Sequence, residues 1–355
     1  MNKKSALAML LAGAMSLSLA ACGGGNNPAP AESKAAEPAQ SQAATPNDGP
    51  KVGATVLKLA FNQTMENPEA KTIVDLSDKL YDATEGRYSI EVYPSEQLGS
   101  QAESMEGVQN GSIDMAIVAN SIVEGANSDF AIIGTPYIYD SIDHQKKLFQ
   151  SGKLDDLFAS TADSGFTVLA AYSLGPRCLY TKELITTPEQ LSGKKIRVMQ
   201  SETMINMLNA MGGVGTAMAQ GDVYSAIQSG VLDGAENNII TYTDLLQYEV
   251  APYYTLTNHL MIPDELIINN DVLSKMSEAD QKALKELSTE SVGVMFDLAE
   301  ELRNTYFDKV QKEFGVTVTE VDIKPFQDRC QSLIDDVANR NDMTKSVYEA
   351  IQSLR

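Results

Sequence analysis

The residues with the clearest chemical potential lie between Lys194 and Asn237, where one arginine alternates with apolar side chains. Arg197 is flanked by Ile196 and Val198, and because side chains alternate along a strand, it points away from the face that these two share. An arginine among apolar neighbours needs an acidic partner or an anionic ligand. Its planar guanidinium would hold a carboxylate at two points. We therefore predict an anion site at Arg197; the alternative is a structural ion pair with a nearby Asp or Glu.

The elements around Arg197 would bring a second polar group beside it. Ser201 is a candidate N-cap of a helix with apolar residues at helical spacing, and a glycine pair stops that helix. A short strand and a second helix that starts near Asp222 follow. Residues 231–237 then turn back toward the strand edge where Arg197 emerges, so Asn237 and Arg197 are predicted to meet in one cleft.

Length and charge narrow the possible classes of protein. The chain has 355 residues, enough for two domains with cores of their own. Its formal net charge of −21 makes nucleic acid and anionic membrane surfaces poor partners. With 43% apolar residues it is expected to be globular rather than disordered. A chain this acidic repels anions at long range, so an anion site requires arginines with fixed geometry.

Strand and helix signals alternate in the first part of the folded chain. Strands are expected at 55–61, 88–93 and 114–119, with helices between them, the first of which is capped by Asn67. This β-α-β-α-β order predicts an α/β fold with a mostly parallel sheet that is covered on both faces. Ligands of such sheets bind at the carboxyl ends of the strands.

Three motifs occur in order around Arg197: K-x-R-V at 195–198, D-V-Y-x-A-I-Q at 222–228 and D-G-x-E-N at 233–237. Together they resemble the solute-binding proteins of tripartite ATP-independent periplasmic (TRAP) transporters of the DctP type, and the resemblance covers roughly residues 55 to 345. It implies a two-domain fold like that of periplasmic binding proteins, with a ligand cleft between the domains and a long helix bridging them.

The same resemblance divides the chain beyond residue 52 into two domains. The chain would cross from the first to the second near Gly175, and a helical pattern that starts at Ser277 would form the bridging helix. Domain I is expected to comprise 53–174 plus 263–302, and domain II 175–262 plus 303–355.

The resemblance also adds candidate ligand contacts. Arg177, in a G-x-R motif at the crossing between the domains, corresponds to an arginine that faces the ligand in the family and would be a second anion contact. Asn62 after the first strand, and Asn120 and Ser121 after the third, take the places of polar contacts. The alternatives are a surface arginine beside a hinge, and Asn and Ser residues that only cap turns and loops.

One position departs from the family. Many members have an aromatic residue in the motif M-x-F-S-E-V-Y, whereas this chain reads M-A-Q-G-D-V-Y at 218–224, with Gln220 at the aromatic position. An amide offers both a donor and an acceptor, so we predict a ligand with a hydroxyl or carbonyl near its carboxylate, such as a hydroxylated or sugar-derived acid. The alternative is that Gln220 faces solvent and that Tyr172 or Phe61 packs against the ligand.

The first 22 residues have the pattern of a bacterial lipoprotein signal: two lysines, an apolar run and the lipobox L-A-A-C, which ends at Cys22. Cleavage before Cys22 and acylation of its thiol would give an exported protein with a lipid anchor in the membrane; the alternative is an ordinary signal peptide. Residues 23–52 are rich in Gly, Pro, Ala, Ser and Gln, which predicts a disordered tether.

These features predict an extracytoplasmic receptor that captures a small organic acid and hands it to the membrane permease subunits of a TRAP transporter. The sequence contains no catalytic motif, cofactor fingerprint or metal-ligand pattern. We therefore expect no enzymatic activity, no cofactor and no metal, and we expect a monomer. The alternatives are a binding module that feeds a sensor kinase and an exported enzyme acting on acidic metabolites. Cys178 and Cys330 either form a disulfide or stay free and buried.

Overall fold

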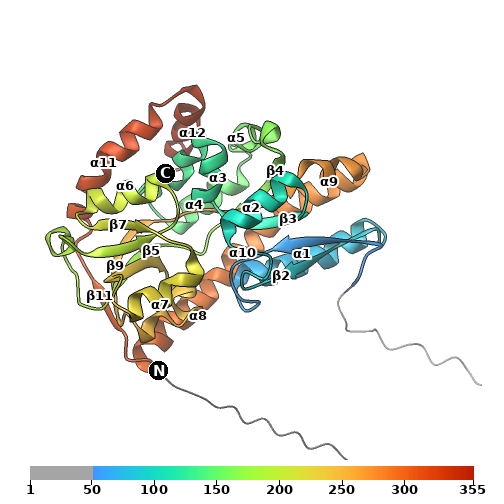
Figure 1. The fold of residues 1–355 in the computed structure, drawn as a ribbon. Helices are drawn as coiled ribbons and strands as arrows, with labels where there is room; N and C mark the ends of the chain where they lie inside the picture. The colour runs from blue at the N-terminus through green and yellow to red at the C-terminus, as the bar shows by residue number, and fades with distance from the viewer. Residues whose placement is uncertain (1–50) are drawn as a thin grey trace, which may run out of the picture. The chain divides into compact units, whose positions relative to one another are not determined.

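The computed structural model describes residues 51–355, whose strands form two sheets (Figure 1). The predicted signal at 1–22, the lipidation at Cys22 and all but the last two residues of the predicted tether lie outside the described residues. The first sheet has the strand order β2-β1-β3-β10-β4, and the second has the order β11-β9-β5-β8-β6-β7. Helices follow most strands, as the α/β prediction requires.

The first sheet consists of β1 (Thr55–Ala60), β2 (Tyr88–Tyr93), β3 (Met115–Ala119), β4 (Phe166–Tyr172) and β10 (Asp264–Asn269). The second consists of β5 (Arg177–Thr181), β6 (Lys195–Val198), β7 (Val214–Ala217), β8 (Gly234–Asn238), β9 (Tyr253–Leu260) and β11 (Thr317–Glu320). The α-helices up to the first crossing between sheets are α1 (Pro68–Ala83), α2 (Gln101–Asn110), α3 (Asn120–Ala126), α4 (Ile142–Gln150) and α5 (Asp155–Ala159). Those that follow are α6 (Glu202–Met211), α7 (Val223–Gln228), α8 (Ile239–Asp244), α9 (Asn270–Lys275), α10 (Glu278–Lys312), α11 (Lys324–Ala338) and α12 (Asp342–Gln352). The 3-10 helices are η1 (Ser128–Gly134), η2 (Ala162–Ser164), η3 (Pro188–Leu191), η4 (Gln220–Asp222) and η5 (Gln247–Glu249).

Side-chain caps start the helices that the sequence predicts. Asn67 accepts a hydrogen bond from the backbone of Glu69 at the start of α1, and Ser201 does the same at the start of α6. Ser277 caps the long helix α10. Each of these oxygens satisfies a backbone N–H that has no partner within its helix. The three predicted helix starts are confirmed.

The first sheet is mostly parallel, as expected, and contains one antiparallel strand, β10. β1 pairs in parallel with β2 and β3, but β10 runs antiparallel to both β3 and β4. The reason is that β10 arrives from the second sheet through the short connection 261–263. It therefore enters the first sheet at the edge where β3 and β4 end, and its first residue, Asp264, lies opposite Ala119 and Tyr172.

Two short segments and one long helix join the sheets. Residues 173–176 connect β4 to β5, and 261–263 connect β9 to β10. Helix α10 packs against α1, α4 and β4 beside the first sheet and against α8 beside the second. The predicted bridging helix is therefore present, and it ends at Lys312.

The carboxyl-terminal segment lies elsewhere than the sequence analysis assigns it. Residues 342–355 were expected in domain II, but α12 packs against η1, which follows β3 of the first sheet. His144 on α4 also hydrogen-bonds the carbonyl of Ile351 at 2.8 Å. The reason is that the apolar side of α12 is buried, with Val347 and Ile351 at 3% and 0% exposure, in a place that sequence order does not indicate.

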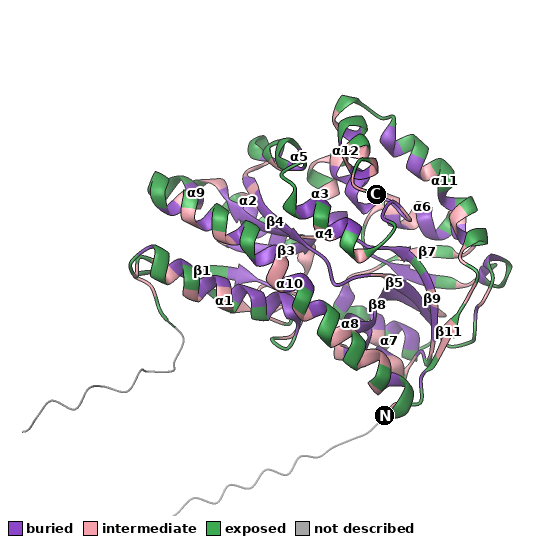
Figure 2. Ribbon diagram, turned by 180° about the vertical axis from the view of Figure 1, so that it is seen from behind, coloured by how far each residue is buried: buried purple, intermediate pink, exposed green. Residues whose placement is uncertain are grey.

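The buried apolar side chains come from the strands and from the inner faces of the helices, and Figure 2 shows most strands as largely buried while the outer faces of the helices are exposed. Within residues 51–355, no helix is both long and apolar enough to cross a membrane.

Candidate ligand-binding site

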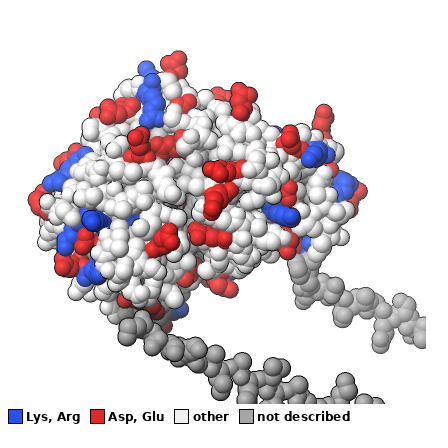
Figure 3. Space-filling view, viewed as in Figure 1, with Lys and Arg blue, Asp and Glu red and all other residues white. Residues whose placement is uncertain are grey.

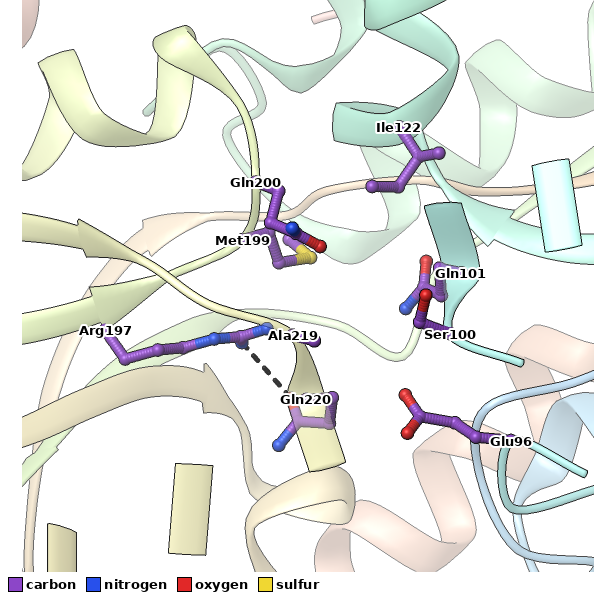
Figure 4. Close-up of a pocket in the computed structure, with 9 residues that line it drawn as sticks. All are labelled: Glu96, Ser100, Gln101, Ile122, Arg197, Met199, Gln200, Ala219 and Gln220. Carbon is purple, nitrogen blue, oxygen red and sulfur yellow. Dashed lines mark hydrogen bonds between the residues drawn. The ribbon is translucent and has the colours of Figure 1, made fainter. Parts of the chain in front are cut away.

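Polar side chains from both sheets converge beside the two crossing segments and line two small adjoining cavities, each of about 20 Å³. The first cavity is lined on the first-sheet side by Glu96, Ser100, Gln101 and Ile122, and on the other side by Arg197, Met199, Gln200, Ala219 and Gln220 (Figure 4). The second cavity shares Gln101, Met199 and Gln220 with the first. Its other lining residues include Asn62, Gln63, Glu69, Arg177, Asn237 and Asp264.

Arg197 is a buried cation without an acidic partner. Its side chain is 2% exposed, Nε donates to the carbonyl of Met218 at 2.8 Å, and one terminal nitrogen donates to Gln220 Oε1 at 3.2 Å. No Asp or Glu among residues 51–355 forms an ion pair with it. Burial lowers the pKa of Arg197 to about 10, which still leaves it charged at neutral pH. The alternative of a structural ion pair is therefore wrong for Arg197.

Arg177 has the opposite environment. It is buried, and it donates to both carboxylate oxygens of Glu236, at 2.6 and 2.8 Å, and to Asn237 Oδ1 at 2.7 Å. Burial alone would raise the pKa of Glu236, but Arg177 and then His259 lower it to about 2. The alternative of a surface arginine is wrong, and the charge of Arg177 is offset because β8 supplies a carboxylate directly beside it. Arg177 lines the second cavity, and its contact with a ligand stays a prediction.

Gln220 and Asn237 connect the two arginines. Gln220 Oε1 accepts from Arg197 and, at 3.3 Å, from Asn237 Nδ2. Gln220 is 8% exposed, so the alternative in which it faces solvent is wrong, and its Nε2 is buried with no hydrogen-bond partner among the described residues. Tyr172 and Phe61 are in the core, and neither lines a cavity.

The three predicted ligand contacts beside the first sheet, Asn62, Asn120 and Ser121, lie in different surroundings. Asn62 lines the second cavity, at the carboxyl end of β1. Asn120 does not line either cavity, because its Nδ2 donates to the carbonyl of Phe130 at 2.9 Å and holds η1 in place. Ser121 also lies outside both linings, but its hydroxyl contacts the sulfur of Met199, which lines both cavities, at 3.6 Å.

Several lining residues were not predicted from the sequence, above all Glu69, Asp264 and Gln63. The signal for Glu69 was available, because Asn67 starts a helix directly after β1 and places Glu69 in the first helical turn. An acidic residue there is usually explained by the helix dipole alone. Asp264 could not be found without knowing that β10 enters the sheet in the antiparallel direction.

The chemistry of the site is that of anion and polar-group recognition. No set of three or more His, Cys, Asp or Glu side chains in the described part of the chain could hold a metal ion. Cys178 and Cys330 are both buried and free, so the disulfide alternative is wrong.

The sequence pattern of the bacterial extracellular solute-binding proteins, family 7, or DctP family, matches residues 60–341. The chain belongs to this family. Its members are transport proteins that bind solutes outside the cytoplasm, and they are not enzymes. This DctP-type protein is therefore a TRAP solute-binding protein for a small organic acid, which confirms the resemblance seen in its motifs.

The relatives of this protein match its sequence over most of their length. A solute-binding protein from Chromohalobacter salexigens is 32% identical, over 80% of this chain and 85% of the relative. A TRAP periplasmic solute-binding protein from Anaerococcus prevotii, solved with bound α/β-D-glucuronate, is 33% identical with a TM-score of 0.81, over 84% of this chain and 98% of the other. A TRAP periplasmic solute-binding protein from Xanthobacter autotrophicus, solved with bound β-D-galacturonate, is 31% identical with a TM-score of 0.81. The match covers 84% of this chain and 99% of the other.

Proposed function

We propose that this TRAP solute-binding protein captures a hexuronate, a six-carbon sugar acid such as D-glucuronate or D-galacturonate, and that Arg197 holds the ligand carboxylate. The observation that carries the proposal is the contrast between two buried arginines. Arg177 is neutralised by Glu236, whereas Arg197 forms no ion pair within residues 51–355 and faces a cavity that Glu96 also lines. An unpaired buried cation is costly, so a site that keeps one is suited to an anion.

The surroundings of Arg197 favour a hydroxylated acid over a plain hydrocarbon acid. Gln220 has a free buried N–H donor beside the guanidinium, and Asn237 and Asn62 add amides to the adjoining cavity. The relatives from A. prevotii and X. autotrophicus were solved with sugar acids bound, which supports the same class of ligand here.

Local charge is needed because the protein as a whole is acidic. The formal net charge is −21, and acidic side chains extend across the middle of the face in Figure 3. The long-range field therefore repels an anion, and attraction begins only near Arg197.

We further infer that the mature protein is anchored by lipid at Cys22, binds as a monomer and delivers its ligand to TRAP permease subunits. The lipobox that ends at Cys22 supports the anchor. Mass spectrometry of the mature amino terminus tests it: a diacylglyceryl group on Cys22 is expected, and an unmodified terminus elsewhere would refute it.

Calorimetric titration tests the ligand class. Purified protein is titrated with D-glucuronate, with D-galacturonate and with neutral D-glucose. We expect micromolar or tighter binding of at least one uronate, about −8 kcal/mol or more favourable, and no measurable binding of glucose. Equal affinity for glucose, or no binding of either uronate, would contradict the proposal. Recovery of chemically unchanged uronate after incubation distinguishes binding from catalysis.

A further inference from the structure

The second cavity gathers buried polar atoms that have no partner in residues 51–355. These atoms are Gln63 Oε1, Glu69 Oε1 and Gln220 Nε2, on side chains that are 6%, 1% and 8% exposed. Buried polar groups are almost always hydrogen-bonded, and an orphaned one is costly. Three such atoms around one cavity therefore indicate groups that a ligand satisfies.

Two of the side chains that line this cavity, Glu69 and Asp264, carry carboxyl groups that interact with each other and shift each other's pKa. Burial, followed by the neighbouring Asp264, raises the pKa of Glu69 well above its ordinary range. Burial raises the pKa of Asp264 to about 6, although Arg177 and Glu69 lower it. Because the pKa of Asp264 is about 6, its carboxylate carries a negative charge at pH 7.5, whereas Glu69 is the more readily protonated of the two.

Within residues 51–355, the negative charge of Asp264 has no unpaired cation beside it in the second cavity. Glu265, next along β10, is buried, and neither of its oxygens has a partner among the described residues. Arg177 faces Asp264 but is already bonded at two points to Glu236. The unpaired cation, Arg197, lines the other cavity.

We propose that Glu69 and Asp264, together with Gln63, form a hydroxyl-binding subsite that accepts the polyhydroxylated part of a monocarboxylate and rejects a ligand with a second carboxylate. This inference rests on the proposed role of Arg197. A hydroxyl both donates and accepts, so it can donate to Gln63 Oε1, Glu69 Oε1 or Asp264 and accept from Gln220 Nε2. A carboxylate can only accept, and at this place it would meet the charge of Asp264. Like charges brought together at a binding site are strongly unfavourable.

The ligand pair that tests this is D-glucuronate and its diacid, D-glucarate, titrated calorimetrically at pH 7.5. Wild-type protein is expected to bind glucuronate about 100-fold or more tightly than glucarate. Glucarate is an open chain and glucuronate forms a ring, so the two ligands also differ in shape. The decisive quantity is therefore how the ratio of the two affinities changes in variants.

Three variants separate charge from shape. Asp264→Asn removes the negative charge, and the ratio is expected to fall at least about tenfold. Glu69→Gln keeps a donor where the acid O–H stood and leaves the charge on Asp264, so the ratio should stay within about threefold of wild type while both affinities change together. Glu66→Gln alters an exposed acid three residues away, outside both cavities, and should leave both affinities unchanged.

The outcomes distinguish this inference from the proposed function. If wild-type protein binds neither D-glucuronate nor D-galacturonate, the proposed function fails and the subsite fails with it. If glucuronate binds but glucarate binds equally well, or if Asp264→Asn leaves the ratio unchanged in a protein whose thermal unfolding stays cooperative, only the subsite is wrong. A ratio that falls as far in Glu69→Gln as in Asp264→Asn would also overturn it, because loss of local structure rather than of charge would then explain both.

Discussion

Arg177 and Glu236 form a buried, two-point ion pair across neighbouring antiparallel strands, with N–O distances of 2.6 and 2.8 Å. Both side chains are nearly inaccessible, at 5% and 0% exposure. The pair sets the two buried arginines apart: Arg177 is paired with Glu236, whereas Arg197 forms no ion pair within residues 51–355.

Removing one member of this pair should destabilise the protein strongly. Glu236→Ala leaves Arg177 buried and unpaired, so we expect a loss of about 3–5 kcal/mol of unfolding free energy. Urea unfolding measures it. The matched control is Lys312→Ala, which removes an exposed pair with Asp308 and should cost about 1 kcal/mol or less. Equal effects of the two changes would mean that the Arg177 pair has no special structural role.

Arg197 should behave in the opposite way. Its charge has no acidic partner within the described chain, so Arg197→Met is expected to leave the stability of ligand-free protein unchanged or to raise it by about 1 kcal/mol. The loss of its hydrogen bonds to Met218 and Gln220 limits the gain. Thermal unfolding without ligand is the measurement, and a loss of several kcal/mol would assign Arg197 to the fold instead.

Stability should rise as the pH falls from about 7.5 to 5. Burial raises the pKa of Glu69 and Glu265 well above their ordinary range and that of Asp264 to about 6. A group with a raised folded-state pKa stabilises the protein below its unfolded pKa, and this contribution is lost as the pH rises through the folded value. Glu236, whose pKa is lowered to about 2, opposes this only as the pH falls below its ordinary 4.5. A melting temperature that stays constant or falls as the pH is lowered from 7.5 to 5 would contradict these pKa shifts. Asp264→Asn should make the melting temperature depend less on pH.

Gln220 should donate a hydrogen bond to a ligand hydroxyl that lies near the ligand carboxylate. Its oxygen is occupied by Arg197 and Asn237, which leaves its N–H as the free group. Wild-type protein is expected to prefer D-glucuronate over its 4-deoxy analogue by about tenfold, the value of one hydrogen bond. Gln220→Phe should abolish most of this preference. If wild-type protein prefers the deoxy compound, or if the preference survives in Gln220→Phe, Gln220 does not contact that hydroxyl.

Local sequence signals predicted the elements around the site well. The stretch from Lys194 to Asn237 folds as strand, helix, strand, helix and strand, with the cap at Ser201, because capping and apolar spacing act within a few residues. Arg197 lines the first cavity and Asn237 the second, and the two are connected by Gln220, which accepts a hydrogen bond from both and lines both cavities.

Long-range relationships could not be predicted in the same way. The direction of β10, the docking of α12 on η1 and the carboxyl pair of Glu69 and Asp264 all join residues far apart in sequence. Nothing local distinguishes a carboxylate that points into a cleft from one on a solvated surface. The pairing of Arg177 with Glu236 was hidden for the same reason, since it depends on which strands are neighbours.

The most direct measurement is the affinity of wild-type protein and Arg197→Ala for D-glucuronate and for its neutral amide, D-glucuronamide. If Arg197 holds the carboxylate, the substitution should weaken glucuronate binding by about 2–5 kcal/mol, roughly 30-fold to several-thousand-fold. It should change the much weaker binding of the amide little, and Arg197→Lys should restore glucuronate binding only in part. Equal losses for the acid and the amide, or unchanged glucuronate affinity in Arg197→Ala, would contradict the central claim.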